Sequence, residues 1–130
     1  MTQEEKQLLL VDLCARLPYG IMVQLVYDED TIKTREMGLG SLHDIMFDNA
    51  EGKPYLRPMS SMTEEEFKMV CSMNALTDTE LRDRINFPDM FIKSYTIETF
   101  DLFNSHHFDY RGLIDKSLAI VAPEGMYKED

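Results

Sequence analysis

The fold is decided by the stretch Ile21-Met22-Val23-Gln24-Leu25-Val26-Tyr27, whose side chains alternate in character along the chain. Such alternation predicts a β-strand with one mixed face and one apolar face, the latter formed by Ile21, Val23, Leu25 and Tyr27. A polar turn at 28–30 leads into Thr31-Ile32-Lys33-Thr34-Arg35-Glu36, which predicts the returning strand of a hairpin. Because one face of the hairpin is apolar, helices from elsewhere in the chain must cover it.

Before the hairpin, residues 3–16 predict a helix. Thr2 can cap it, and acids occupy its first turn, where the helix dipole favours them. Helical spacing predicts one stripe of side chains facing the core, formed by Leu10, Leu13, Cys14 and Leu17. The second cysteine, Cys71, lies on the apolar face of a later predicted helix. We therefore expect two reduced and buried thiols.

After the hairpin, the pattern predicts more of the sheet. Residues 42–47 predict a third strand, with Ile45 and Phe47 facing inward. The run 53–58 contains two prolines, which favour an extended backbone, and it predicts an edge strand. We expect a three- to four-stranded antiparallel meander, and strong twist would curl it into a half-barrel.

The second half of the chain is rich in helix-start signals. Two capping boxes, Thr63–Glu66 and Thr77–Glu80, predict helices that end near residues 74 and 85, the second broken by Pro88. Strands followed by helices indicate the α+β class, and we find no linker or repeat, so one domain over 1–130 is expected. The remaining expectations are a helix over 97–104 with Ile97, Phe100 and Phe103 on or near one face, final turns over 113–119, and a loose tail from residue 122.

Charge narrows the choice of partners. The 130 residues include 13 basic and 24 acidic ones, which gives a net charge of −11. A protein of this sign is repelled by phosphate backbones and anionic lipid, so direct nucleic-acid binding is not expected. The first residues lack the basic start of an export signal, and no run of about 18 apolar residues occurs. We therefore expect no membrane span and a cytoplasmic protein.

Two blocks resemble a known group of proteins. They are Lys53–Glu66, which reads KPYLRPMSSMTEEE, and His106–Ile114, which reads HHFDYRGLI. Together with 15–20 and 122–127, they are similar to uncharacterised small proteins encoded by gut Bacteroidales genomes and their phages or other mobile elements. The resemblance implies an intracellular protein of phage or mobile-element origin. That group has no assigned reaction, so the resemblance assigns no catalytic residue.

The segment His106-His107-Phe108-Asp109-Tyr110-Arg111 holds the densest set of chemically capable side chains. Two imidazoles and a carboxylate could ligate a metal, but adjacent side chains diverge by about 100° on a helix and point to opposite faces of a strand. We therefore favour a helix end and predict no metal and no cofactor. Asp109 is expected to form an Asx-turn and Arg111 to reach a distant carboxylate. Alternatively, His106, His107 and Asp109 contact a ligand or a partner, and Tyr110 and Arg111 recognise an anionic group.

A second candidate segment, 55–61, precedes a predicted helix start. Ser60 and Ser61 beside a helix N-terminus, with Arg57 close in sequence, could cradle an anion. A nucleophilic serine would need a base and an oxyanion hole, and the G-x-S-x-G pattern is absent. We favour a capped helix start, with ligand or partner contact as the alternative for all three residues.

No catalytic residue set emerges, so we predict a non-enzymatic protein-interaction module. It would bind a protein partner or a second copy through the open edge of the sheet or through the Met-rich region after Pro58. One alternative is an acidic inhibitor that mimics nucleic acid, which the charge of −11 suggests. The other is a small metal-dependent enzyme that uses His106, His107, His43 and Asp109, and elemental analysis of the purified protein would test it.

Overall fold

The predicted hairpin is confirmed by β1 (Met22–Asp28) and β2 (Thr31–Glu36), which pair antiparallel. This is a computed structural model that describes residues 1–127, without the side chains of residues 88 and 89. The sheet has four strands in the order β2-β1-β3-β4. Strand β3 (Glu51–Leu56) pairs antiparallel with β1, whereas β4 (Ile120–Val121) pairs parallel with β3. The α+β class is therefore confirmed, but the sheet is mixed and open rather than an antiparallel meander or a curled half-barrel.

The predicted third strand over 42–47 is wrong, because this segment forms helix α2 (Leu39–Met46). Leu42 and Ile45 are buried, as predicted for Ile45, but Phe47 is 61% exposed. A spacing of three residues between two apolar side chains suits a helix, and a short apolar run does not distinguish it from a strand. Gly52 of β3 explains how closely α2 approaches, since a Cβ there would collide with the side chain of Ile45.

The proline-containing run forms part of an internal strand, not an edge strand. Pro54 of β3 lies opposite Val23 of β1, and β4 pairs only with Tyr55 and Leu56, beyond the residue that lacks an N–H. Strand β4 comes from residues that the sequence places in irregular structure. Residues 113–119 form turns rather than a regular helix, and within the described residues the tail is ordered, with Ala122 N–H donating to the Leu56 carbonyl.

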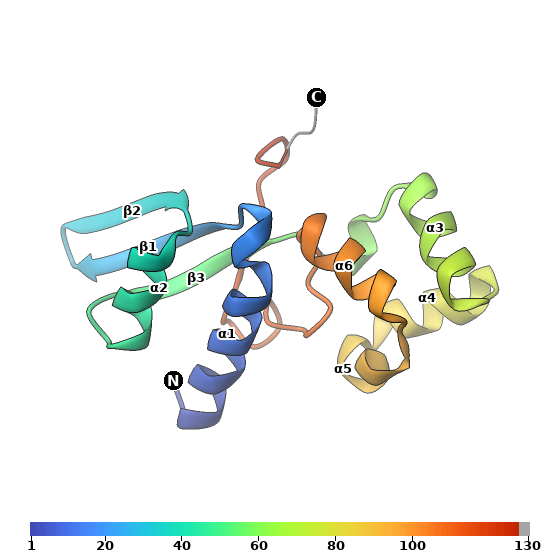
Figure 1. Cartoon of the computed structure of the whole chain (residues 1–130), viewed down its shortest axis with the longest axis horizontal. Coiled ribbons are helices and arrows are strands. Elements are labelled where there is room, and N and C mark those ends of the chain that lie inside the picture. Colours follow the sequence, from blue (N-terminus) through green and yellow to red (C-terminus); the bar gives the residue numbers. More distant parts are fainter. Residues whose placement is uncertain (128–130) are drawn as a thin grey trace.

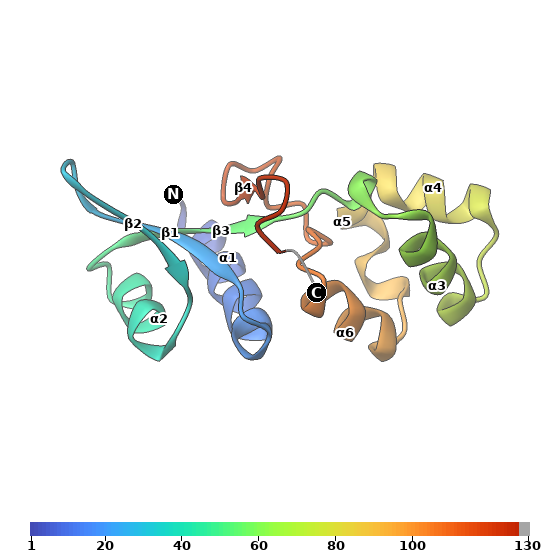
Figure 2. The same ribbon diagram turned by 90° about the horizontal axis from the view of Figure 1, so that it is seen from above.

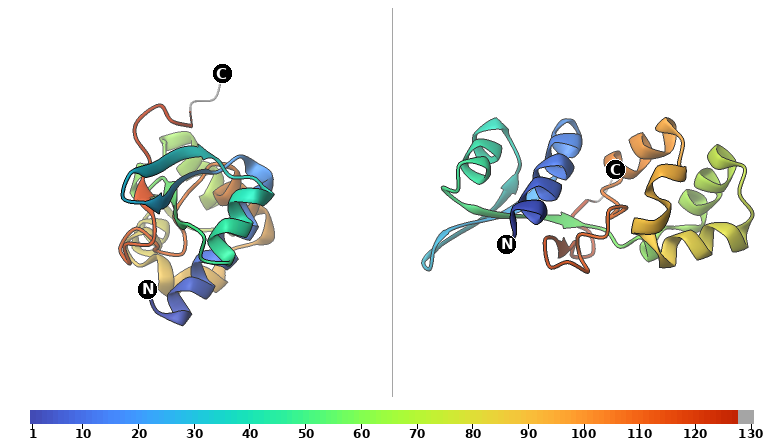
Figure 3. Two further views of the ribbon diagram at one scale, coloured as in Figure 1. Left: turned by 90° about the vertical axis from the view of Figure 1, so that its left-hand side faces the viewer. Right: turned by 90° about the horizontal axis from the view of Figure 1, so that it is seen from below.

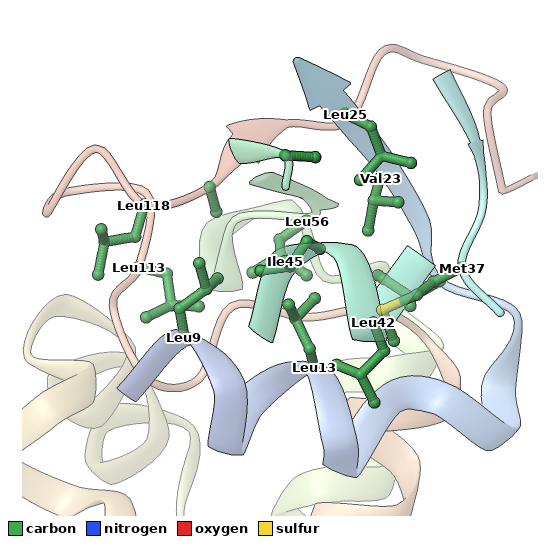
Figure 4. Close-up of a cluster of buried hydrophobic side chains, with 13 residues drawn as sticks. Leu9, Leu13, Val23, Leu25, Met37, Leu42, Ile45, Leu56, Leu113 and Leu118 are labelled. Atoms are coloured by element: carbon green, nitrogen blue, oxygen red, sulfur yellow. The ribbon is translucent and has the colours of Figure 1, made fainter. Parts of the chain in front are cut away.

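Helices α1 (Gln3–Arg16) and α2 lie on the same side of the sheet (Figure 2). They cover the apolar face of β1, and Figure 4 shows Leu9 and Leu13 of α1 pointing toward the strands. Cys14 is exposed, so the prediction of a buried thiol is wrong for it and right for Cys71. This aliphatic core consists of Leu9, Leu13, Ile21, Val23, Leu25, Met37, Leu42, Ile45, Ala50, Leu56, Leu113, Leu118 and Ala119.

The remaining helices form a second group around an aromatic-rich core. They are α3 (Glu64–Asn74), α4 (Asp78–Asn86), α5 (Pro88–Phe91) and α6 (Ile97–Ser105), with short 3-10 helices at Met59–Ser61 and Ile92–Ser94, whereas the 3-10 helix Leu17–Tyr19 follows α1 in the first group. Both predicted capping boxes are present, and Thr2 forms a third. Proline 88 ends α4 but also begins α5, where its fixed φ suits a first turn. The buried members are Met59, Val70, Cys71, Leu81, Tyr95, Leu102, Phe103, Phe108 and Tyr110. Ile97, at the start of α6, is 82% exposed.

The two groups form two lobes side by side (Figures 1 and 3). The sheet lobe contains α1, α2, the four strands and residues 113–119. The helical lobe, residues 57–110, is an insertion in the sequence between β3 and β4. The chain therefore crosses the junction between the lobes twice, once just after β3 and once on its way back from α6.

Candidate functional site

The two segments singled out in the sequence are the two crossings of the chain between the lobes. Arg57 and Phe108 form a parallel β-bridge there. Arg57 N–H donates to the His107 carbonyl at 2.7 Å, and Asp109 N–H donates to the Arg57 carbonyl at 2.8 Å. The structure thus brings together Arg57 and residues 106–109, which are about fifty residues apart in the sequence.

Arg57, Glu66 and His106 form a charged cluster on the helical side of the junction. The Arg57 guanidinium donates two hydrogen bonds to the Glu66 carboxylate, at 2.8 and 2.9 Å, and lies 4.2 Å above the ring of Phe108. His106 Nδ1 lies 2.7 Å from Glu66 Oε2. Burial would raise the pKa of Glu66, but the hydrogen bonds from Arg57, the Thr63 N–H and His106 outweigh it and lower the pKa to about 2.

His106 and His107 have different surroundings, as expected for adjacent residues. His106 caps the C-terminus of α6, so the prediction of a helix end is confirmed for it. His107 has a φ of 64°, is 7% exposed, and stacks on Tyr127 with ring centroids 3.7 Å apart. Its Nδ1 is buried with no hydrogen-bond partner among the described residues. Burial, followed by the charge of Arg16, lowers the pKa of His107 to about 4, which keeps the ring neutral.

A buried ion-pair network joins α1 to the returning chain. Asp12 and Arg16 are both fully buried, and Arg16 Nε donates to Asp12 Oδ2 at 2.8 Å. Arg111 Nη1 donates to the other oxygen of Asp12 at 2.7 Å, so the prediction that Arg111 reaches a distant carboxylate is confirmed. Arg16 Nη2 also donates to the Phe108 carbonyl at 2.6 Å. Sequence reasoning missed Asp12 and Arg16; their spacing of four on one helix was the available signal.

Asp109 and Tyr110 complete the second crossing. Asp109 accepts hydrogen bonds from the backbone N–H groups of Leu113 and Ile114, four and five residues on, rather than from residue 111 as the predicted Asx-turn requires, so that prediction is wrong in its geometry. Burial raises the pKa of Asp109, and these two hydrogen bonds oppose the shift. The Tyr110 hydroxyl donates to the side-chain oxygen of Asn104 at 2.8 Å. These contacts place both residues in the structural framework of the junction.

Of the two serines, Ser61 is joined to Arg57 through its backbone, because Arg57 Nη2 donates to the Ser61 carbonyl at 3.3 Å. Both serines are exposed, and the Ser61 hydroxyl donates to the Pro58 carbonyl at 2.6 Å within its own turn. Neither hydroxyl is hydrogen-bonded to a histidine among the described residues. The helix start that follows uses Thr63 as its cap, which agrees with the structural interpretation of this segment.

Tyr127 also belongs to the junction, although no catalytic or binding motif in the sequence singles it out. Its hydroxyl accepts from the Met22 N–H at 2.9 Å and donates to the Tyr55 carbonyl at 2.7 Å, so it bridges β1 and β3 where their ladder ends. Burial raises the pKa of Tyr127 to about 12. A small cavity of about 270 Å³ lies beside it, lined by Arg57, Thr63, Glu65, Glu66, His106, His107 and Tyr127.

The chemistry available at the junction is limited. Among the described residues, no group of three or more histidine, cysteine, aspartate or glutamate side chains is placed to hold a metal ion. The charged groups there are mostly paired with one another, which makes the junction a connection between the lobes. In the same part of the chain, none of the helices has the length and apolarity needed to cross a membrane.

A different surface lies at the far end of the sheet lobe. Strand β2 is the outer strand of the sheet, and five of its six residues are exposed. A cavity of about 480 Å³ separates its C-terminal end from α2, lined by Tyr27, Arg35, Glu36, Gly38, Gly40, Ser41, His43 and Asp44. The Tyr27 hydroxyl donates to Asp44 at 2.8 Å and so fixes α2 beside the strands.

Comparison of the chain with models of known protein families, with curated proteins and with solved structures finds no match.

Proposed function

We propose that the protein is a non-enzymatic protein-interaction module that binds its partner along the open edge of β2. The observation that carries this proposal is the exposed outer position of β2 in the sheet. An edge strand presents unpaired N–H and C=O groups, and an extended segment of another protein can pair with them as an additional strand.

The alternative binding region in the sequence, the methionines after Pro58, has less surface to offer. Met59 is buried in the helical lobe, and Met62 and Met73 pack against the same core. Met69 is 41% exposed, so one methionine of the four remains at the surface. These side chains mainly fill the core, and β2 is the better candidate for the interface.

The contacts of the chemically capable residues support a binding role rather than catalysis. Glu66 binds Arg57 and His106, and Asp12 binds Arg16 and Arg111. A nucleophile with a nearby base is missing from the contacts of the described residues. The metal-dependent enzyme and the nucleic-acid mimic stay predictions without a structural observation in their favour. Action inside a cell, and an origin in a phage or mobile element, form part of the proposal.

Hydrogen exchange on the protein with a partner recovered from host lysate tests this function. We expect the partner to protect the backbone amides of 31–36, and the double variant Ile32→Asp, Thr34→Asp to lose the partner. Both side chains are exposed, so the variant should fold. Val121→Asp, on β4 at the opposite edge, is the matched control and should retain the partner. Protection confined to the helical lobe would contradict the proposal.

A further inference from the structure

We infer that the segment bound by β2 is acidic and extended, with acidic and apolar residues in alternation. This inference rests on the proposed function and adds the chemistry of the partner. The observations that carry it are the two basic side chains on one face of β2 and the exposed isoleucine on the other face.

Lys33 and Arg35 lie on the face of β2 that looks toward α2. Lys33 is paired with Leu25 and Arg35 with Val23, and paired residues of an antiparallel ladder share a face. Leu25 and Val23 are buried in the core under the helices, which identifies that face. The Lys33 ammonium lies 5.6 Å from the centre of the Tyr27 ring, and Tyr27 is bonded to α2.

The charges of Lys33 and Arg35 are available to a partner. Neither side chain forms an ion pair within the part of the chain that the structure describes, whereas Arg16, Arg57 and Arg111 do. In a protein with a net charge of −11, two cations on one exposed strand form a local exception. Opposite charges across neighbouring strands are favourable, so acidic side chains of an added strand suit this face.

The opposite face of β2 calls for a different residue type. Ile32 pairs with Val26 on the uncovered side of the sheet and is 57% exposed. An apolar side chain of the added strand would pack beside it. Because side chains of a strand alternate between faces, one extended segment meets both requirements only if acidic and apolar residues alternate along it.

The charges also decide against a second copy of this chain as the occupant. Pairing β2 with β2 of a second copy would place four cations, Lys33 and Arg35 from each, along one short ladder. Like charges at an exposed edge oppose such pairing, and each molecule also carries a net charge of −11. An acidic partner avoids the first of these repulsions.

The test uses the full chain and a fluorescein-labelled peptide of sequence Val-Glu-Val-Glu-Val-Glu-Val. We expect saturable binding by fluorescence anisotropy, with amide shifts in residues 31–36 by NMR. The double variant Lys33→Glu, Arg35→Glu should bind at least about ten-fold more weakly. Lys53→Glu is the matched control, because Lys53 is exposed and pairs with Gln24 on the opposite face of the sheet; its affinity should change by less than about two-fold.

The outcomes separate this inference from the proposed function. Equal binding of the Val-Lys counterpart peptide, or full binding by the charge-reversed variant, would overturn the acidic partner and leave edge binding intact. Absence of binding by the Val-Glu peptide would also overturn the inference, while the hydrogen-exchange experiment with the recovered partner decides edge binding independently. A dimer formed through β2, seen by sedimentation, would replace the acidic partner with a second copy.

Discussion

The two lobes differ in how far apart in the sequence their core residues lie. The helical lobe draws its core from one continuous stretch, 59–110, and fills it with aromatic rings such as Phe103, which stacks on Tyr110 at 5.5 Å. The sheet lobe has an aliphatic core that combines Leu9 near the start with Leu118 near the end of the chain. One lobe can form from local contacts, whereas the other requires the chain to return.

The junction is where this difference has consequences. The sheet lobe is complete only after the chain has come back from α6, because β4 and residues 113–119 belong to it. Asp12, Arg16 and Arg111 hold the returning segment against α1. The fully buried carboxylate at their centre therefore links the closing of the sheet lobe to the position of the helical lobe.

The largest effect is expected from Asp12→Ala, which breaks this link. It leaves the fully buried Arg16 and the largely buried Arg111 without their shared carboxylate, and the free energy of unfolding should fall by about 3–5 kcal/mol. Urea unfolding can be monitored through amide signals in each lobe. In this variant we expect the unfolding transitions of the two lobes to occur at different urea concentrations. Glu64→Ala, which removes an exposed ion pair with Lys68, should cost less than about 1 kcal/mol. Equal losses in both variants would contradict the role of Asp12.

A second prediction concerns acid and the junction histidine. The pKa of His107 is about 4 in the folded protein, against an ordinary value of 6.5. Between these two pH values the imidazole is protonated in the unfolded state and neutral in the folded state. Its contribution to stability is therefore complete above pH 6.5 and is lost as the pH falls toward 4, by about 3 kcal/mol. In His107→Asn, whose side chain tolerates the positive φ, this pH dependence should disappear.

Urea titrations between pH 7 and pH 4 measure the effect. His43→Asn, on the exposed side of α2, controls for the loss of an imidazole. An unchanged slope in His107→Asn would show that His107 is not the responsible group. Below pH 4.5 a separate loss is expected, because the unfolded state protonates Glu66 while the folded state keeps it ionised beside Arg57 until the pH falls to its folded pKa of about 2.

The smallest effect compares one capping box in each lobe. Thr63→Ala and Thr2→Ala each remove a side-chain acceptor at a helix N-terminus, which costs about 1 kcal/mol. We expect the larger loss for Thr63, because Glu66 of its box also holds Arg57 and His106, whereas Thr2 and Glu5 lie at an exposed chain end. Thermal unfolding of both variants gives the comparison. A larger loss for Thr2 would show that the Thr63 box acts independently of the junction.

Particular elements show how far prediction from the sequence reaches. The hairpin and the helix starts at Thr63 and Thr77 follow from residues within a few positions of one another. The prediction of a strand at 42–47 is wrong because a short apolar run is consistent with either a helix or a strand. Only the positions of the neighbouring strands decide between the two. The prediction for the buried face of α1 is wrong because it leaves out Asp12 and Arg16. These two charged side chains can be buried only where Arg111 and the Phe108 carbonyl form hydrogen bonds with them.

The candidate site divides in the same way. Segment 106–111 was recognised as chemically capable, and its helix-end role was predicted for His106. The residues that contact this segment, Glu66 and Tyr127, are not predicted as its partners. The sequence pattern predicts only a helix-cap role for Glu66 and a loose tail around Tyr127.

By itself, the sequence determined the α+β class, the hairpin, the capped helices and the acidic charge, because each depends on composition or on neighbours along the chain. Only the tertiary structure decided the parallel β4, the insertion of the helical lobe, the ion-pair junction and the open position of β2. These features depend on contacts such as that between Arg16 and the Phe108 carbonyl, 92 residues apart. Such contacts form only when residues far apart in the sequence come together and close a long loop. A local sequence pattern does not indicate which distant residues will make contact.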